Sequence, residues 1–324
     1  MAFIKRKIDV ELSLNGDTFD GSNNVVRLTG LRVSALIHEF LGGVGNWAND
    51  ATLRISGMKN ADMAHLSTLG FIAANYNSPS GKMNNIKVYA GDDDAGMSLV
   101  FSGGITSGNV NYNAQPDVGV DLVCSALADL QFQRVAPSSY KGAMDVATML
   151  QAICDAATPP IGFVNNGVTS KLVNHAVGGS PKHQIEDICL AAGIFSKFTN
   201  GTSGRMLTIW PPGANADNTI INVGPDTGMV GYPQYSVHGI NISCLFNPRI
   251  EVGRQINVTS STPAPAANAP LQVPGTLPGQ GPLHISGANG TFPVIAVTHD
   301  LASETPGGPW FTHVEMTSLP YFAR

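Results

Sequence analysis

Short segments in which apolar and polar residues alternate recur along much of the chain. In residues 8–14 every second side chain is apolar, which is the two-residue period of a strand with one buried face. Asn15-Gly16 follows, a dipeptide typical of a tight hairpin turn. Further segments of this kind, separated by Gly, Asn or Asp, cover residues 51–56, 85–90, 98–102 and 119–124. The pattern predicts a β-rich region over residues 1–130.

One helix is expected to interrupt these strands. Asn60 is placed to cap it, and Met63, Leu66 and Leu69 would share one face before Gly70 ends it. We therefore expect the first region to be a small β-barrel or β-sandwich that carries a single helix.

The period changes in the middle of the chain. Within residues 145–157 the apolar side chains recur at helical spacing, and Pro159-Pro160 ends the segment. Ser180-Pro181 is an N-cap followed by a first-turn proline, and Gly193 closes this second helix. Short segments at 194–198 and 206–210 predict strands. Residues 131–215 are therefore expected to form a helix-containing α/β insert.

Strand-like spacing returns after the insert, at residues 218–223, 239–245, 254–259, 291–298 and 310–317. The two β-regions also share a weak plan, because the strands and glycine turns of residues 85–105 have counterparts in 248–258 and 291–297. The expected fold class is mainly β (α+β). Two β-barrel or β-sandwich domains, residues 1–130 and 216–324, would flank the insert.

A proline-rich stretch interrupts the second β-region. From Gln255 to His299, 45 residues pass without one Asp, Glu, Lys or Arg. Two interpretations are open for residues 260–283: a flexible linker with polyproline II character, or an insertion that orders against a neighbouring subunit. As a candidate interface loop, this segment contains Pro263, Pro265, Pro270, Pro274, Pro278 and Pro282.

Composition narrows the class of function. Charged residues make up 13% of the chain, about half the usual share, and the 36 glycines and 21 prolines suit many turns. With 43% hydrophobic residues and a mean hydropathy of +0.06, the chain is too apolar for intrinsic disorder. A net charge of −5 offers no basic field to nucleic acid, and no apolar run is long enough for membrane insertion. A weakly charged surface favours a component of a protein assembly.

No motif establishes a catalytic or cofactor site. Residues 43–48 match G-x-G-x-x-A but lack the preceding buried strand and the following helix of a dinucleotide site. Asp92-Asp-Asp94 could attract a divalent cation, although its place between two glycines is more typical of a solvated turn. The eight histidines form no i, i+4 pair on an expected helix, and the four cysteines lie among apolar residues, as buried free thiols do. We expect no cofactor and no enzymatic activity.

Several packing patterns resemble a known family, the baseplate hub proteins of contractile-tailed bacteriophages. The resemblance lies in Cys244-Leu-Phe-Asn-Pro-Arg-Ile-Glu-Val-Gly253 with its continuation to residue 258, and in the return strand 290–301 followed by the Trp-containing strand 310–316. Segments 85–91 and 100–105 are similar to the tube-like domain of the same family.

The resemblance implies a structural protein of the virion, located in the tail baseplate and assembled in the host cytoplasm. Hubs of this family are homotrimers whose subunits carry two tube-like β-domains each, so that the ring has pseudo-sixfold symmetry. The implied partners are a hexameric tail tube protein, a trimeric central spike protein and other baseplate proteins. DNA would pass through the lumen without specific binding, and a mildly negative wall suits that passage.

Two alternatives remain open. Another tail ring protein, such as a distal-tail or tube-terminating protein, would use similar β-domains but form a ring of six. A cell-wall or polysaccharide hydrolase would need two carboxylates facing each other across a cleft, roughly 5–10 Å apart.

Overall fold

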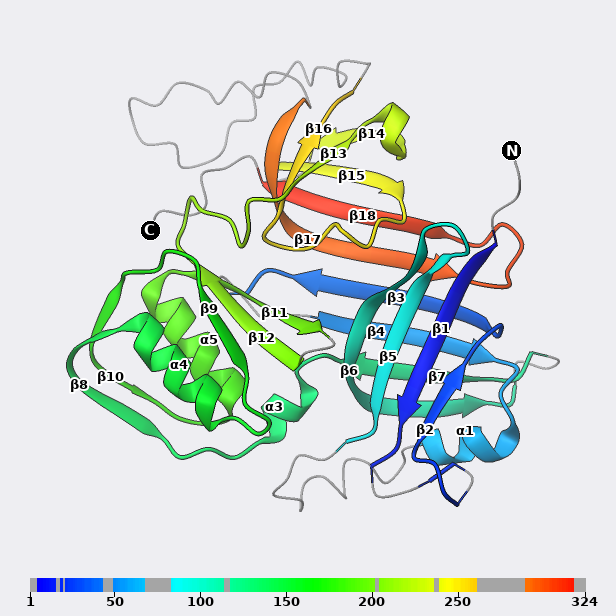
Figure 1. Ribbon diagram of the computed structural model, residues 1–324, viewed down its shortest axis with the longest axis horizontal. Coiled ribbons are helices and arrows are strands. Elements are labelled where there is room, and N and C mark those ends of the chain that lie inside the picture. Colours follow the sequence, from blue (N-terminus) through cyan, green and yellow to red (C-terminus); the bar gives the residue numbers. More distant parts are fainter. Residues whose placement is uncertain are drawn as a thin grey trace.

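The structure is a computed structural model that describes residues 5–15, 18–19, 21–42, 49–67, 83–113, 117–201, 204–235, 239–260 and 289–317. In these residues strands predominate, and most of them belong to one large sheet (Figure 1). The mainly β fold class expected from the sequence is confirmed.

The first β-region consists of two layers that share one long strand, β6. The first half of β6 pairs with β5, and its second half pairs with β7 in the other layer. Alternate residues such as Val10, Leu53 and Val88 are fully buried between the layers. The elements are β1 (Arg6–Ser13), β2 (Val25–Leu28), β3 (Arg32–Phe40), β4 (Asn49–Ser56), α1 (Asn60–Leu66), β5 (Asn85–Asp92), β6 (Gly96–Asn111), β7 (Gly119–Ser125) and α3 (Ala128–Phe132).

Two local predictions for this region differ from the structure. The hairpin after β1 is not a two-residue turn, because Ser13 pairs with Val25 and the Leu14 N–H donates to the Asn24 carbonyl at 2.7 Å. Asn60 is the first residue of α1 and not its cap, a position that Lys59 holds without a side-chain hydrogen bond. Met63 and Leu66 are buried as expected.

The insert packs two helices between a sheet and a two-stranded ribbon (Figure 1). The expected helix start is confirmed, since the Ser180 hydroxyl accepts from the His183 N–H and Pro181 follows it. Gly193 ends the helix with φ of 63°, a left-handed conformation that favours glycine. The elements are β8 (Ser138–Asp145), α4 (Val146–Ala156), β9 (Gly162–Asn165), β10 (Lys171–Val177), α5 (Pro181–Ala192), β11 (Phe195–Gly201) and β12 (Gly204–Trp210).

The second β-region is again a pair of layers with one long shared strand, β17. Its first residues pair with β16, and its remainder pairs with β18. Ile242, Ile256 and Val314 contribute to the core between the layers. The elements are β13 (Ile220–Val223), the 3₁₀ turn η1 (Pro225–Thr227), β14 (Met229–Tyr235), β15 (Gly239–Leu245), β16 (Gln255–Val258), β17 (Gly290–Ala302) and β18 (Trp310–Thr317).

The two β-regions repeat one strand order. The order β3-β4-β7-β6-β5-β1 corresponds to β14-β15-β18-β17-β16-β13, both across the sheet and along the chain. The match extends to single residues. Gly104 and Pro293 are the last residues to pair with β5 and β16, and a one-residue bulge follows at Thr106 and at Ile295. The weak sequence repeat therefore reflects a duplicated unit; one difference is that β13 lies parallel to its neighbour, whereas β1 is antiparallel.

The two units are joined edge to edge into a 13-stranded sheet. β17 of the second unit pairs with β3 of the first in an antiparallel ladder that runs from Ala296↔Phe40 to Ala302↔Ser34. Leu301 and Trp310 of the second unit also belong to the core of the first. This ladder makes the two β-regions continuous in one sheet. The domain boundaries expected from the sequence stay a prediction.

Candidate functional site

One face of the large sheet covers the two cores, and the opposite face is largely exposed. On this outer face a row of directly paired residues crosses both units: Leu245, Phe311, Asp300, Leu36, Thr52 and Val123. Leu245, Leu36 and Val123 are 48%, 38% and 46% exposed. A broad exposed face that carries apolar side chains is typical of a surface that other protein covers.

The next row on the same face is polar and internally satisfied. The His38 Nδ1 lies 2.9 Å from the Thr298 hydroxyl, across the ladder that joins the units. The His313 Nδ1 lies 2.8 Å from the Ser243 hydroxyl in the second unit. The outer face therefore presents hydrogen-bonded His, Thr and Ser side chains at the junction of the two units and beside it.

In the described residues some strand edges of the repeated units, that of β13 among them, are not paired with a strand, and two of these edges bear on assembly. One is the outer edge of β14, where Val230 and Tyr232 are 41% and 64% exposed. The other is the outer side of β6 beyond Gly104, where β5 has ended, although α1 lies against Gly108. These edges correspond to the edges of β3 and β17 that meet inside the chain. Unpaired edges are templates for pairing with another chain.

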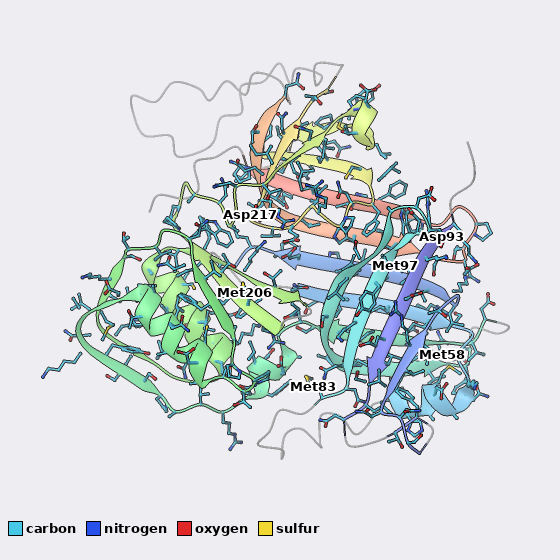
Figure 2. The ribbon with its side chains drawn as sticks, viewed as in Figure 1. Met58, Met83, Asp93, Met97, Met206 and Asp217 are labelled. Carbon is cyan, nitrogen blue, oxygen red and sulfur yellow. The ribbon has the colours of Figure 1, made fainter. Side chains whose placement is uncertain are left out.

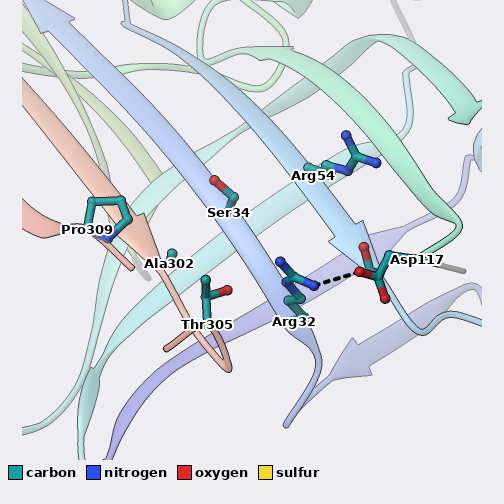
Figure 3. Close-up of a pocket in the computed structure, with 8 residues that line it drawn as sticks. Arg32, Ser34, Arg54, Asp117, Ala302, Thr305 and Pro309 are labelled. Atoms are coloured by element: carbon teal, nitrogen blue, oxygen red, sulfur yellow. Dashed lines mark hydrogen bonds and ion pairs between the residues drawn. The ribbon is translucent and has the colours of Figure 1, made fainter. Parts of the chain in front are cut away.

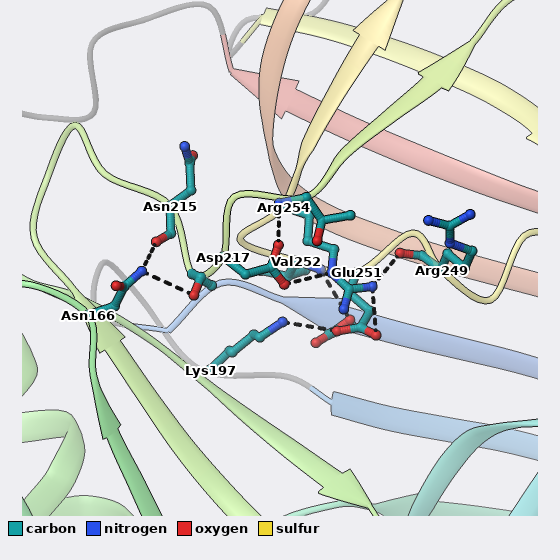
Figure 4. A network of polar contacts seen from close by, with 11 residues as sticks. Asn166, Lys197, Asn215, Asp217, Arg249, Glu251, Val252 and Arg254 are labelled. Atoms are coloured by element: carbon teal, nitrogen blue, oxygen red, sulfur yellow. Dashed lines mark hydrogen bonds and ion pairs between the residues drawn. The ribbon is translucent and has the colours of Figure 1, made fainter.

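A partly buried polar junction lies where the two β-regions and the insert meet (Figure 4). Glu39 comes from β3, Lys197 from β11, Glu251 and Arg254 from the loop before β16, and Asp217 from the segment before β13. The Lys197 Nζ lies 3.0 Å from a Glu251 oxygen, and the Lys197 side chain is only 8% exposed. Figure 2 labels Asp217 in the segment that connects the insert to the second β-region. The junction ties together elements that are far apart in sequence.

Arg254 completes the second half of this junction. Its guanidinium bonds Asp217 at 2.9 Å and Glu251 at 3.0 Å, and it also donates to the Arg249 carbonyl at 2.6 Å. Burial tends to raise the pKa of Asp217, but hydrogen bonds from Arg254 and Thr219 outweigh burial and hold that pKa below its usual value. Asp217 is therefore bound to Arg254 in its ionised form.

Glu39 is the exceptional member of the junction. One of its oxygens accepts from the Val252 N–H at 3.4 Å. Burial raises the pKa of Glu39 to about 7, with Glu251 adding repulsion and Lys197 and Arg254 opposing the shift. Three carboxyl groups and two cations share the site, so the junction is electrically neutral only when one carboxyl is protonated, and Glu39 is the group whose pKa favours this.

A small cavity of about 90 Å³ adjoins Glu39 and Glu251, and His299 also lines it. Burial lowers the pKa of His299 to about 4, and its Nδ1 lies 3.0 Å from the Thr312 hydroxyl. A carboxyl with a raised pKa beside a second carboxylate is a pattern that hydrolases use. However, pockets that bind small molecules usually measure about 300–1,000 Å³, so this cavity is too small for a sugar ring.

A larger pocket of about 300 Å³ opens near the start of β3 and the end of β4 (Figure 3). Arg32 and Arg54 line it with Ser34 and Thr305. Arg32 is bound to Asp117 at 2.8 Å, and Arg54 lies 3.9 Å from Asp121. All four charged side chains are at least 41% exposed, and pairs of this kind contribute little to stability.

The sequence model of one protein family, the baseplate hub gp41 family, matches residues 18–270 of this chain. The chain belongs to this baseplate hub family. It is therefore a structural component of a phage tail baseplate, and its place is in the virion. No curated protein matches the hub protein in sequence.

Two solved structures share the fold of the hub protein. The E. coli c3393 protein, a component of the type VI secretion system with structural similarity to the T4 bacteriophage tail proteins gp27 and gp5, aligns with 96% of this chain and 77% of its own, at 12% identity and a TM-score of 0.57. The tail protein from Neisseria meningitidis MC58 aligns over 98% of both chains, at 10% identity and a TM-score of 0.57. At such low identity these likenesses show the fold alone.

Only some of the candidate site residues named from the sequence lie within the described part of the chain. The six prolines of the candidate interface loop and the G-x-G-x-x-A motif lie outside the described residues, so both stay predictions. Asp92 accepts from the Asp94 and Ala95 N–H groups, which makes the hairpin-tip turn, and Asp93 pairs with Lys7. Figure 2 shows Asp93 at this tip. Within the described ranges no three His, Cys, Asp or Glu residues form a group that could hold a metal ion.

The four cysteines are buried free thiols, as expected. Burial raises the pKa of Cys154 and Cys189 to about 12 and that of Cys244 to about 11, so these thiols stay protonated at neutral pH. No helix in the described part of the chain is long and apolar enough to span a membrane.

Sequence reasoning missed Glu39, Lys197, Glu251 and Arg254. One signal was present, because Lys197 stands between Phe195 and Phe198 in a segment that the sequence predicts to be a strand. A charge in such a place has to find a partner, but the sequence does not show which one.

Proposed function

We propose that the protein is the trimeric hub of the baseplate and joins the hexameric tail tube to the trimeric central spike. Its ring would form part of the tail channel, without covalent chemistry. The duplicated unit carries this proposal. Each chain brings two copies of the repeated unit, already joined edge to edge through β17 and β3. Three chains therefore present six similar units, which suits a sixfold tube on one side and a threefold spike on the other.

The repeat also suggests how neighbouring subunits meet. Inside the chain, β17 of one unit pairs with β3 of the other. By the correspondence of strands, β6 of one subunit would pair with β14 of the next. Asp300 pairs with Leu36 in the internal ladder, and their counterparts by register are Asn111 and Gln234. We therefore propose that Asn111 faces Gln234 of the neighbouring subunit.

A cross-linking experiment tests this arrangement. Opposite residues in an antiparallel ladder have Cα atoms about 4.5–5.5 Å apart, which a disulfide can bridge. The variant N111C/Q234C should oxidise to covalent dimers and trimers, seen by non-reducing electrophoresis. The native thiols are buried and should not interfere. N111C alone, Q234C alone and the mismatched pair N111C/K171C serve as controls, and equal cross-linking of the mismatched pair would contradict the proposed register.

Mass photometry and electron-microscopy class averages test the oligomer itself. We expect a particle of three 33.9 kDa chains whose projection shows six similar lobes around a channel. A particle of six chains would favour a distal-tail or tube-terminating ring instead. A protein that stays monomeric at high concentration and binds neither tube nor spike would overturn the hub proposal.

A further inference from the structure

The polar junction contains three carboxyl groups but only two cations, so its charges do not balance when all of its groups are ionised. Its members are Glu39, Lys197, Glu251, Arg254 and Asp217. Lys197 can satisfy Glu251, and Arg254 can satisfy Glu251 and Asp217 together. Among the described residues, Glu39 accepts only a long hydrogen bond, from the Val252 N–H at 3.4 Å. The surplus carboxyl therefore sits at the point where the insert meets both β-regions.

The polar junction lies next to a backbone contact that attaches the insert to the first β-region. The end of β3 is bridged to β11 of the insert by two hydrogen bonds, from the Gly42 N–H to the Ser196 carbonyl at 3.1 Å and from the Ser196 N–H to the Gly42 carbonyl at 3.3 Å. Glu39 lies three residues before this bridge, and Lys197 lies next to Ser196. A change of charge on Glu39 therefore acts directly on the attachment of the insert.

We propose that Glu39 is a proton-operated latch, which holds the insert against the β-regions when it is protonated and loosens it when it is ionised. The proposal goes beyond the hub function and does not depend on the number of subunits in the ring. It concerns the full chain in any oligomeric state.

The net charge around Glu39 depends on the charged side chains of the described residues that face it. Lys197 approaches from the insert, and Glu251 and Arg254 approach from the loop before β16, with Asp217 bound to Arg254. His299 of β17 lines the same cavity and is neutral above about pH 4. The cavity wall from β6, residues Leu99 to Ser102, contributes no titratable side chain. Ionisation of Glu39 therefore leaves one negative charge in the junction that no cation matches.

The sign of the pH effect follows from linkage. The pKa of Glu39 is about 7 with the insert attached, against 4.5 for the ordinary side chain. Attachment is thus firmest below pH 4.5, weakens by up to about tenfold per pH unit above it, and becomes constant above pH 7. The pH at which the curve becomes flat reports the protonation of Glu39 in the attached state.

Hydrogen–deuterium exchange of peptides that contain Gly42, Ser196 and Val252, measured on the full chain from pH 5 to pH 8 and corrected for intrinsic rates, tests the latch. In the unmodified protein we expect protection to fall up to about pH 7 and then to stay level. E39Q keeps the shape but cannot ionise, so its protection should not fall as the pH rises to 7. D155N removes an exposed carboxylate on α4 and should behave like the unmodified protein.

Two further variants separate a latch from a merely structural role. K197M removes an attraction that favours ionised Glu39, so the level part of the curve should begin at a higher pH. E251Q removes a repulsion, so the level part should begin at a lower pH. These opposite shifts can be measured even if E39Q folds poorly. A pH dependence that is the same in E39Q and the unmodified protein, or shifts of equal sign in K197M and E251Q, would overturn the proposal.

Discussion

Gly253 lies against Trp210 at the edge of the polar junction. Its replacement tests the close packing of the backbone against the Trp210 ring. It has φ of +82°, and a Cβ at this position would lie 2.7 Å from the Ala216 Cβ and 2.9 Å from two ring carbons of Trp210. The backbone has little room to move, because the Gly253 N–H donates to Val294 and its carbonyl accepts from Ala216. G253A should therefore cause both backbone strain and a steric clash.

The expected size of the effect follows from these two causes. A left-handed conformation costs a non-glycine residue about 1–2 kcal/mol, and overpacking a buried site costs about 1–3 kcal/mol. G253A should therefore lower the free energy of unfolding by about 2–5 kcal/mol, measured by urea unfolding followed by tryptophan fluorescence. Domains of ordinary stability have about 5–15 kcal/mol to lose, so the change is large.

A matched glycine separates the clash from the strain. Gly213 has the same φ of +82°, but a Cβ there would meet no atom within 4 Å. G213A should therefore lose only the 1–2 kcal/mol of backbone strain, roughly. In a W210F background, where the ring is smaller, G253A should be less destabilising than in the unmodified chain. Equal losses for G253A and G213A would refute the packing described at Trp210.

Two further predictions concern polar groups. Arg205 of β12 donates to both Asp129 oxygens at 2.9 Å and to the Ala126 carbonyl at 2.8 Å. R205A should lower the unfolding free energy by about 2–3 kcal/mol, which is less than the loss for a fully buried pair because Asp129 is 25% exposed. R205K should recover only part of this loss, because lysine cannot donate to both carboxylate oxygens in the same way. Full recovery by R205K in urea unfolding would contradict this geometry. His299, whose pKa burial lowers to about 4, stabilises the fold fully above pH 6.5 and loses that contribution as the pH falls toward 4. Melting temperatures of H299N should therefore vary less between pH 4 and pH 6.5, and an unchanged slope would count against a buried neutral imidazole.

The sequence predicted strands best where one face is buried and the other exposed. Residues 119–125 and 310–317 alternate regularly, and both are strands with buried and exposed residues in turn. β3 was missed because Glu39 occupies an inward-facing place in the alternation, where an apolar residue would be expected. The ribbon of β8 and β10 was missed because most of its residues are exposed, which leaves no apolar stripe to detect.

Glycines misled the prediction in β6. Gly103, Gly104 and Gly108 look like turn residues, yet they lie inside one long strand. A Cβ at Gly108 would lie 2.2 Å from the Leu66 carbonyl oxygen, and one at Gly103 would lie 2.6 Å from the Ser125 carbonyl oxygen. The backbone of another segment of the same chain comes too close for a side chain at these positions. This close approach, and not a turn, requires glycine. Only the three-dimensional structure shows that neighbour.

The duplication was visible in the sequence only as a faint plan. Packing between strands accepts many apolar residues, so two units can keep the same register and the same bulge after their sequences have diverged. The polar junction was less predictable still, since its five charged residues come from four separate segments. Partners so distant along the chain leave no local pattern.

The ladder between β17 and β3 has a consequence for assembly. In the proposed ring, six junctions of the same kind would have to form. A chain with two fused units makes every second junction during its own folding, at the effective concentration set by its own connections. Only three junctions then lie between separate subunits. Joining three chains into one particle costs the translational and rotational freedom of two bodies, whereas joining six separate units would cost that of five. Fusion of the units thereby lowers the subunit concentration at which the ring can close.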